Sequence, residues 1–156
     1  MKHLKTLLTK KFVSMFFFFA FVFYFTLPVM AAEKFVDNGN GTITDTKAGL
    51  MWAATDNKIP ISWPNGVEYC KKLQTGGYTD WRMPTLAELQ SIYTPNEKNG
   101  NGYHTTALIF TTAQSCWASE TDGYKAARFN FTHGKEYWLR QSFSGATRVL
   151  PVRNSK

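Results

Sequence analysis

Cysteine and histidine are scarce in this 156-residue chain, which holds two cysteines and three histidines. It contains no CxxC pair and no HExxH motif, and it has neither a phosphate-binding glycine loop nor a nucleophile elbow. These absences argue against a zinc or redox site and against the common hydrolase and nucleotide-binding classes. We therefore expect a protein that is not an enzyme and that uses no cofactor or metal.

Acidic residues are scarce toward the C-terminus. Residues 123–156 hold seven Lys or Arg against one Glu, whereas residues 33–122 hold seven Lys or Arg against ten Asp or Glu. The last quarter of the chain is thus a basic segment on an otherwise mildly acidic domain. Such a charge balance favours negatively charged partners.

The first 32 residues have the composition of a signal peptide. Four lysines precede an apolar run from Phe12 to Val29, and small residues follow where a signal peptidase can cut. We expect cleavage after residue 32, a domain over residues 33–156, and export to the periplasm, the cell surface or the medium. The alternative is an uncleaved anchor, which is the one way we expect the chain to contact a membrane. Export also disfavours nucleic acid as a partner.

Both cysteines, Cys70 and Cys116, lie after the predicted signal peptide. An oxidising compartment tends to pair cysteines, so we predict a disulfide between them. Closing a loop of this length would stabilise the fold by roughly 4 kcal/mol through the entropy of the unfolded chain.

The order of turns and apolar residues predicts an α+β domain. An Asn-Gly turn at residues 38–41 and a second turn at residues 46–49 divide residues 34–52 into an N-terminal β-meander. Two short amphipathic helices follow, the first capped at Ser62 and the second starting with a capping box of Thr85 and Glu88. C-terminal antiparallel strands are then expected at residues 115–119, 125–131, 135–140 and 147–152.

The segment between the two predicted helices, residues 76–88, is dense in turn and capping signals. We predict that Asp80 and Arg82 form a structural ion pair or hydrogen-bonding pair that fixes this turn. The polar, glycine-rich stretch of residues 96–106 predicts a long surface loop, either a variable excursion or a binding loop.

Several segments match a known pattern: Phe35 to Asp45, Gly49 to Trp52, Tyr69-Cys70, Gly76-Gly77, Asp80 to Thr85, Cys116 to Ser119, Ala127 to Phe131, and Val149 to Arg153. Through them the chain resembles the Lcl C-terminal domain family, named for a Legionella collagen-like adhesin, over nearly all of residues 33–156. The resemblance implies a C-type-lectin-like fold in secreted or surface bacterial proteins. It also implies sulfated-glycan binding, which is known for the founding adhesin.

The chain departs from its relatives in three respects. It has no collagen-like repeat, and it lacks the Glu-Pro-Asn and Trp-Asn-Asp motifs of calcium-dependent lectins, so we expect no calcium-dependent sugar binding. Family members often carry a cysteine in the last strand, where this chain has Leu150. The related formylglycine-generating enzymes use paired cysteines, so a reactive Cys116 is the alternative to a disulfide.

Five residues of the basic segment are candidates for ligand binding. Neighbouring residues of a strand point to opposite faces, and on this basis we predict that Arg128, Trp138 and Arg140 share one face, with Lys125 and Arg148 nearby. Guanidinium groups suit sulfate and carboxylate, and an indole can stack on a sugar ring.

The predicted function is calcium-independent binding of an anionic polysaccharide on this sheet. The alternative is a protein-interaction or envelope-assembly module whose partner is a surface protein.

Overall fold

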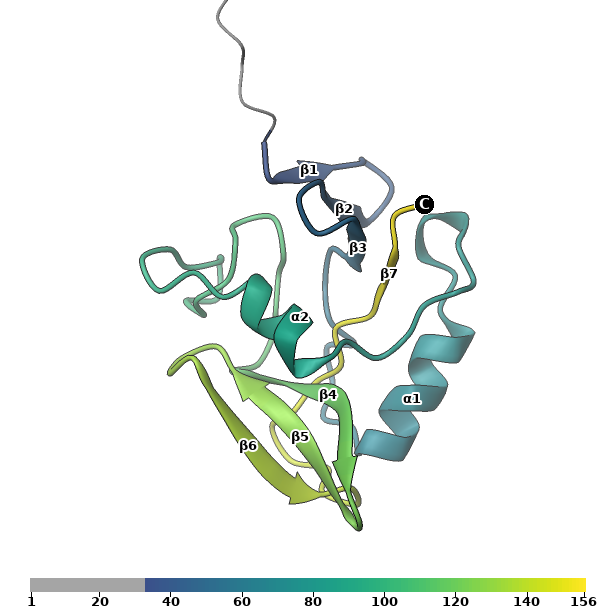
Figure 1. Cartoon of the computed structure of the whole chain (residues 1–156), viewed down its shortest axis with the longest axis vertical. Coiled ribbons are helices and arrows are strands. Elements are labelled where there is room, and N and C mark those ends of the chain that lie inside the picture. The colour runs from purple at the N-terminus through teal and green to yellow at the C-terminus, as the bar shows by residue number, and fades with distance from the viewer. Residues whose placement is uncertain (1–32) are drawn as a thin grey trace, which may run out of the picture. The chain divides into compact units, whose positions relative to one another are not determined.

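Ten short elements make up the part of the chain that the computed structural model describes, residues 33–156 (Figure 1). The predicted signal peptide, residues 1–32, lies outside this part. Seven strands, two α-helices and one 3₁₀ turn confirm the α+β class. Neither α-helix has the length and apolar run that would let it cross a bilayer, as judged over the described residues.

The first sheet has the order β1-β2-β3-β7 and is antiparallel throughout. Its first three strands are the predicted meander, β1 (Phe35–Asp37), β2 (Thr42–Asp45) and β3 (Leu50–Ala53). The fourth is β7 (Val152–Asn154), which pairs with β3. The strand predicted over residues 147–152 therefore begins only at Val152, and its partner is β3 of the meander.

The second sheet has the order β4-β5-β6. It consists of β4 (Ser115–Asp122), β5 (Lys125–Asn130) and β6 (Lys135–Arg140), close to the predicted bounds. The backbone at Gly134 has a φ of 64°, which glycine adopts without strain, and it closes the hairpin between β5 and β6.

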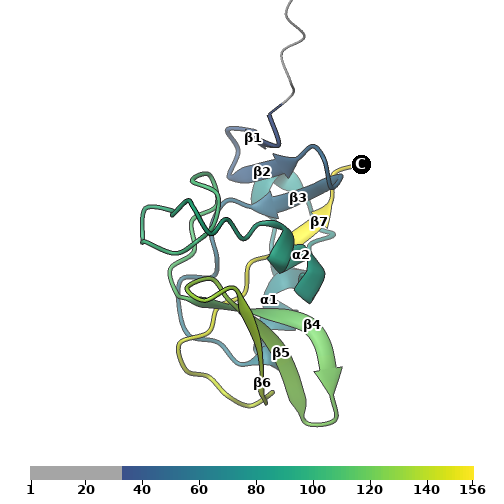
Figure 2. The same cartoon turned by 60° about the vertical axis from the view of Figure 1, so that its left-hand side comes forward.

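The two α-helices cover opposite faces of this second sheet (Figures 1 and 2). Helix α1 (Trp63–Lys72) packs Cys70 in a cluster with Trp117 of β4. Helix α2 (Leu86–Ser91) packs Leu89 in the larger cluster that contains Cys116. We refer to these faces as the α1 face and the α2 face.

This arrangement explains why the predicted disulfide is absent. Cys70 and Cys116 are both free and buried. Trp117 points toward Cys70, so its strand neighbour Cys116 points to the other side of β4, into the other cluster. The disulfide prediction was wrong because β4 separates the two sulfur atoms.

The segment between the helices has the predicted capping box, but its ion pairs differ from the predicted one. Thr85 and Glu88 form the complete capping box. Arg82 pairs with Glu88 at 2.6 Å, while Asp80 pairs with Arg153 of β7 at 2.6 Å. The prediction of an Asp80–Arg82 pair was wrong, since each residue has a partner in another element.

Candidate functional site

The register of β5 against β6 decides which candidate residues lie together. Arg128 is directly opposite Tyr137, whereas Trp138 is opposite Ala127 and Arg140 is opposite Lys125. Opposite residues of an antiparallel pair share a face. Arg128 therefore lies on the α1 face, and the prediction that it shares a face with Trp138 and Arg140 was wrong.

On the α1 face, the guanidinium of Arg128 lies close to two aromatic rings. The guanidinium carbon is 5.6 Å from the centre of the Tyr137 ring and 5.9 Å from that of Phe143, distances at which a cation is attracted to a ring. The Nη1 group donates a hydrogen bond to Thr147 Oγ1 at 3.0 Å. Both rings are substantially exposed, Tyr137 by 39% and Phe143 by 40%. We call Arg128, Tyr137, Phe143 and Thr147 the arginine clamp.

The charge of Arg128 is not compensated within the described residues. It forms no ion pair with any carboxylate of residues 33–156, and its Nε is buried without a hydrogen-bond partner. Burial lowers the pKa of Arg128, because it removes water that would stabilise the cation. A guanidinium with unused donors and no counter-ion is well suited to an anionic group.

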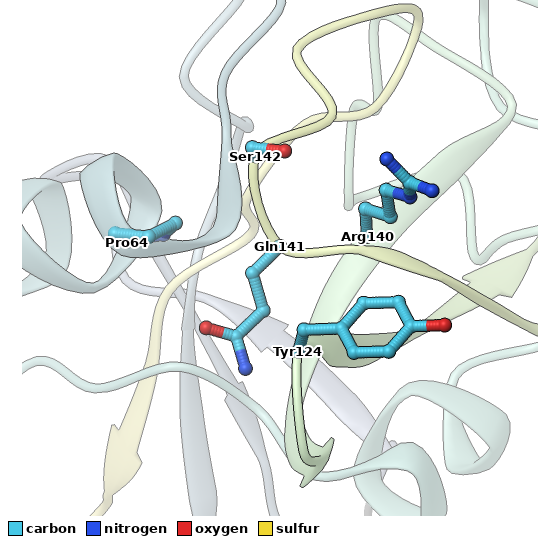
Figure 3. A pocket seen from close by; sticks show the side chains of 5 residues that line it. All are labelled: Pro64, Tyr124, Arg140, Gln141 and Ser142. Carbon is cyan, nitrogen blue, oxygen red and sulfur yellow. The ribbon is translucent and has the colours of Figure 1, made fainter.

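A second grouping surrounds an open hollow of about 550 Å³ at the end of β6 (Figure 3). Tyr124, in the turn between β4 and β5, is 66% exposed. The guanidinium carbon of Arg140 is 5.9 Å from the centre of the Tyr124 ring, and Lys125 Nζ is 5.8 Å from it. Pro64, Gln141 and Ser142 complete the lining. Arg140 and the exposed Tyr124 ring thus line the hollow together, and Lys125 contacts the same ring without lining the hollow.

The other two predicted residues lie apart from these groupings. Trp138 is exposed on the α2 face of β6. Arg148 lies beyond the far edge of the sheet, where its backbone bridges to Cys116 of β4 and its Nε donates to Thr112 Oγ1 at 3.1 Å. Arg148 thus supports a local hydrogen-bond network, and its link to the clamp is through its chain neighbour Thr147, whose carbonyl accepts a hydrogen bond from Arg148 Nη1.

Sequence reasoning missed most of the aromatic part of both groupings. The face predicted for Arg128 held Trp138 and therefore excluded its strand neighbour Tyr137, because alternation alone cannot tell which face of β6 meets which face of β5. Phe143 lies after β6 in a segment without periodicity, so no sequence signal indicated that it contacts Arg128. The exposed turn position of Tyr124 was the one available hint.

The thiols do not form a reactive centre. Burial raises the pKa of Cys70 to about 12 and raises that of Cys116 well above its ordinary value. Reactive cysteines need the opposite shift, so the structure argues against a nucleophilic Cys116. Among residues 33–156, no three His, Cys, Asp or Glu side chains gather as metal ligands would.

An α+β domain whose notable exposed groups are arginine and aromatic side chains has the chemistry of a binding module. The profile of the Lcl C-terminal domain matches residues 41–153, and the chain therefore belongs to that family. This is an adhesin-type family and not a family of enzymes. None of the curated proteins compared with the chain matches it significantly. The C-type-lectin-like character of the fold stays a prediction.

Proposed function

We propose that this protein is an exported binding module that recognises anionic or sulfated glycans without calcium. Membership of an adhesin-type family supports a binding function. The observation that favours an anionic ligand is the arginine clamp, in which Arg128 has no carboxylate partner among the described residues and lies beside two exposed rings.

The arginine and the two rings of the clamp have separate roles in this proposal. Arg128 donates paired hydrogen bonds to a sulfate or carboxylate, which restores the electrostatic stabilisation that burial removes. The Tyr137 and Phe143 rings provide apolar faces on which a sugar ring stacks. Lys125 and Arg140, beside the hollow at the end of β6, add positive potential that attracts a polyanion.

The test is retention on immobilised heparin in a salt gradient, with titration calorimetry against soluble heparin. We expect Arg128→Gln to weaken binding roughly tenfold or more, because it removes charged hydrogen bonds. Lys47→Gln is the matched control, since it removes one charge from an exposed turn of the first sheet. Equal losses in the two variants would show that binding is unspecific charge attraction and would refute the role of the clamp.

Calcium independence and export are tested separately. Heparin affinity should be the same in calcium and in a chelator, because the chain lacks the carboxylate motifs of calcium-dependent lectins. For export, N-terminal sequencing of the protein recovered from the cell envelope or medium should begin near residue 33. A chain that keeps its first residues in those fractions would contradict cleavage.

A further inference from the structure

Strand β6 forms an open edge of the second sheet. It pairs with β5 on one side, and no other strand of residues 33–156 pairs with it on the other. Figures 1 and 2 both show β6 at the outer side of its sheet. Five of its six residues are exposed, including Tyr137 and Trp138. Natural proteins seldom leave such an edge with large apolar side chains.

The direction of the free hydrogen-bonding groups follows from the hairpin. Gln141 N donates to Tyr124 O at 2.9 Å, and Gly134 N donates to Asn130 O at 2.8 Å. Inward and outward groups alternate along an antiparallel strand, so Glu136 and Trp138 direct their N–H and C=O groups away from β5. Among the described residues the backbone groups of Glu136 and Trp138 have no hydrogen-bond partner, whereas the carbonyl of Arg140, which also points outward, accepts from Phe143 N at 2.9 Å and keeps one lone pair free.

We propose that this edge pairs with β6 of a second copy of the chain, antiparallel about a two-fold axis at Trp138. In this register Glu136 lies opposite the second copy's Arg140, and the same ion pair forms again across the axis. Tyr137 lies opposite the second copy's Leu139, and the two Trp138 residues face each other. The edge is therefore complementary to itself in charge and in apolar character.

The charges single out this register. Neither Glu136 nor Arg140 forms an ion pair within residues 33–156, so both are available to a partner. A shift of one residue would bring inward-facing groups to the edge and leave them without partners. A shift of two would place Glu136 opposite Trp138 or opposite Ser142, and both ion pairs would be lost.

The proposed dimer does not depend on the glycan proposal, but it would affect ligand binding. Its sheet would be continuous across six strands, with both copies of Arg128 on one face. Strand spacing and rise place the two Arg128 positions roughly 16 Å apart. A polyanion that reaches both clamps would gain avidity.

Sedimentation equilibrium without any glycan tests the dimer. An interface of one strand per copy is small, so we expect a dissociation constant in the micromolar to millimolar range. Glu136→Arg and Arg140→Glu should each weaken self-association roughly tenfold or more, because each places like charges opposite one another twice. Lys72→Glu, on the exposed part of α1, should leave it unchanged.

Mixing the two charge variants gives the sharper test. Their heterodimer restores two opposite-charge pairs, so the mixture should associate more tightly than either variant alone, and the double variant should regain self-association. Oxidation of Trp138→Cys should crosslink two chains, because residues paired at the axis lie within disulfide distance. A wild-type chain that stays monomeric at millimolar concentration, or a mixture that does not associate, would overturn the proposal. Heparin binding by that monomer would leave the glycan proposal intact.

Discussion

Replacing Glu88 by glutamine tests how the segment between the helices is held. The Glu88 carboxylate accepts hydrogen bonds from Arg82 Nη1 at 2.8 Å, from Arg82 Nη2 at 2.6 Å and from the Thr85 amide at 2.8 Å. One carboxylate therefore joins the start of α2 to the extended segment before it. A glutamine oxygen can still accept from the Thr85 amide, but it cannot form the charged pair with Arg82.

The contacts set the size of the effect. Hydrogen bonds to charged groups contribute about 1.5 to 3 kcal/mol. The Glu88 side chain is 17% exposed and that of Arg82 is 42% exposed, so solvent screens part of this attraction. We expect Glu88→Gln to lower the free energy of unfolding by about 1 to 2 kcal/mol at pH 7. Glu88→Ala also removes the cap and should cost about 1 kcal/mol more.

The loss should depend on pH. Burial alone would raise the pKa of Glu88, but hydrogen bonds from Arg82 and Thr85 outweigh it and lower the pKa below its ordinary value. A carboxyl with a lowered folded pKa stabilises fully above its unfolded pKa of about 4.3 and loses this contribution as pH falls through the folded pKa. The stability difference between wild type and Glu88→Gln should therefore shrink below about pH 4.

Urea unfolding of both proteins from pH 7 down to about pH 3 measures this difference. Glu68→Gln is the control, because Glu68 pairs with Lys71 on the exposed side of α1 and its loss should leave the midpoint unchanged. A loss below about 0.5 kcal/mol at pH 7 would refute the structural role of the pair. So would a difference of the same size at every pH.

Three further predictions address the core and the turns. Without reductant, thiol titration should find two free thiols per chain after denaturation and almost none before it, since Cys70 and Cys116 are buried and unpaired; a denatured chain without free thiols would restore the disulfide. Gly134→Ala and Gly123→Ala should each lower the free energy of unfolding by about 1 to 2 kcal/mol, because both glycines have a left-handed backbone. Gly134→Ala should lower it further, since its Cβ would lie 2.6 Å from the Tyr93 ring, whereas the Cβ at position 123 meets nothing. Equal losses in urea unfolding would contradict this. Asp56→Asn should lower the free energy of unfolding by about 1 to 3 kcal/mol, because each buried carboxylate oxygen accepts from a backbone amide, and the amide nitrogen of Asn would be a donor facing either Thr112 N or Lys58 N. An unchanged midpoint would show that the site rearranges.

Local sequence signals predicted the elements well where the interacting residues lie close together in the chain. The capping box at Thr85 and the two glycine-containing turns of the meander act over three or four residues, and all are present in the structure. The last strand was misplaced because its partner is β3, about a hundred residues away. Apolar residues at 149–152 are equally compatible with either sheet, so periodicity could not decide between them.

The disulfide prediction was wrong for a related reason. Cysteine count and predicted export favour pairing, but neither carries information on which side of β4 each sulfur lies. The structure places Trp117 and Cys116 in different clusters, and that separation depends on helices packing against both faces.

The candidate site was predicted only in part, and the packing of Leu139 explains which part was wrong. The alternation of side chains along each strand was predicted correctly. Which face of β6 lies on the same side as which face of β5 depends on the strand register, and the loop that ends at Gly134 sets that register. A one-residue shift would turn every β6 side chain to the other face. That would bring Trp138 and Arg140 to the face of Arg128, as predicted, but it would also remove Leu139 from the cluster around Trp117 and Ala126. Packing of an apolar residue on the α1 face therefore determines that Arg128 meets Tyr137 and that Arg140 lies on the other face, free to meet a partner.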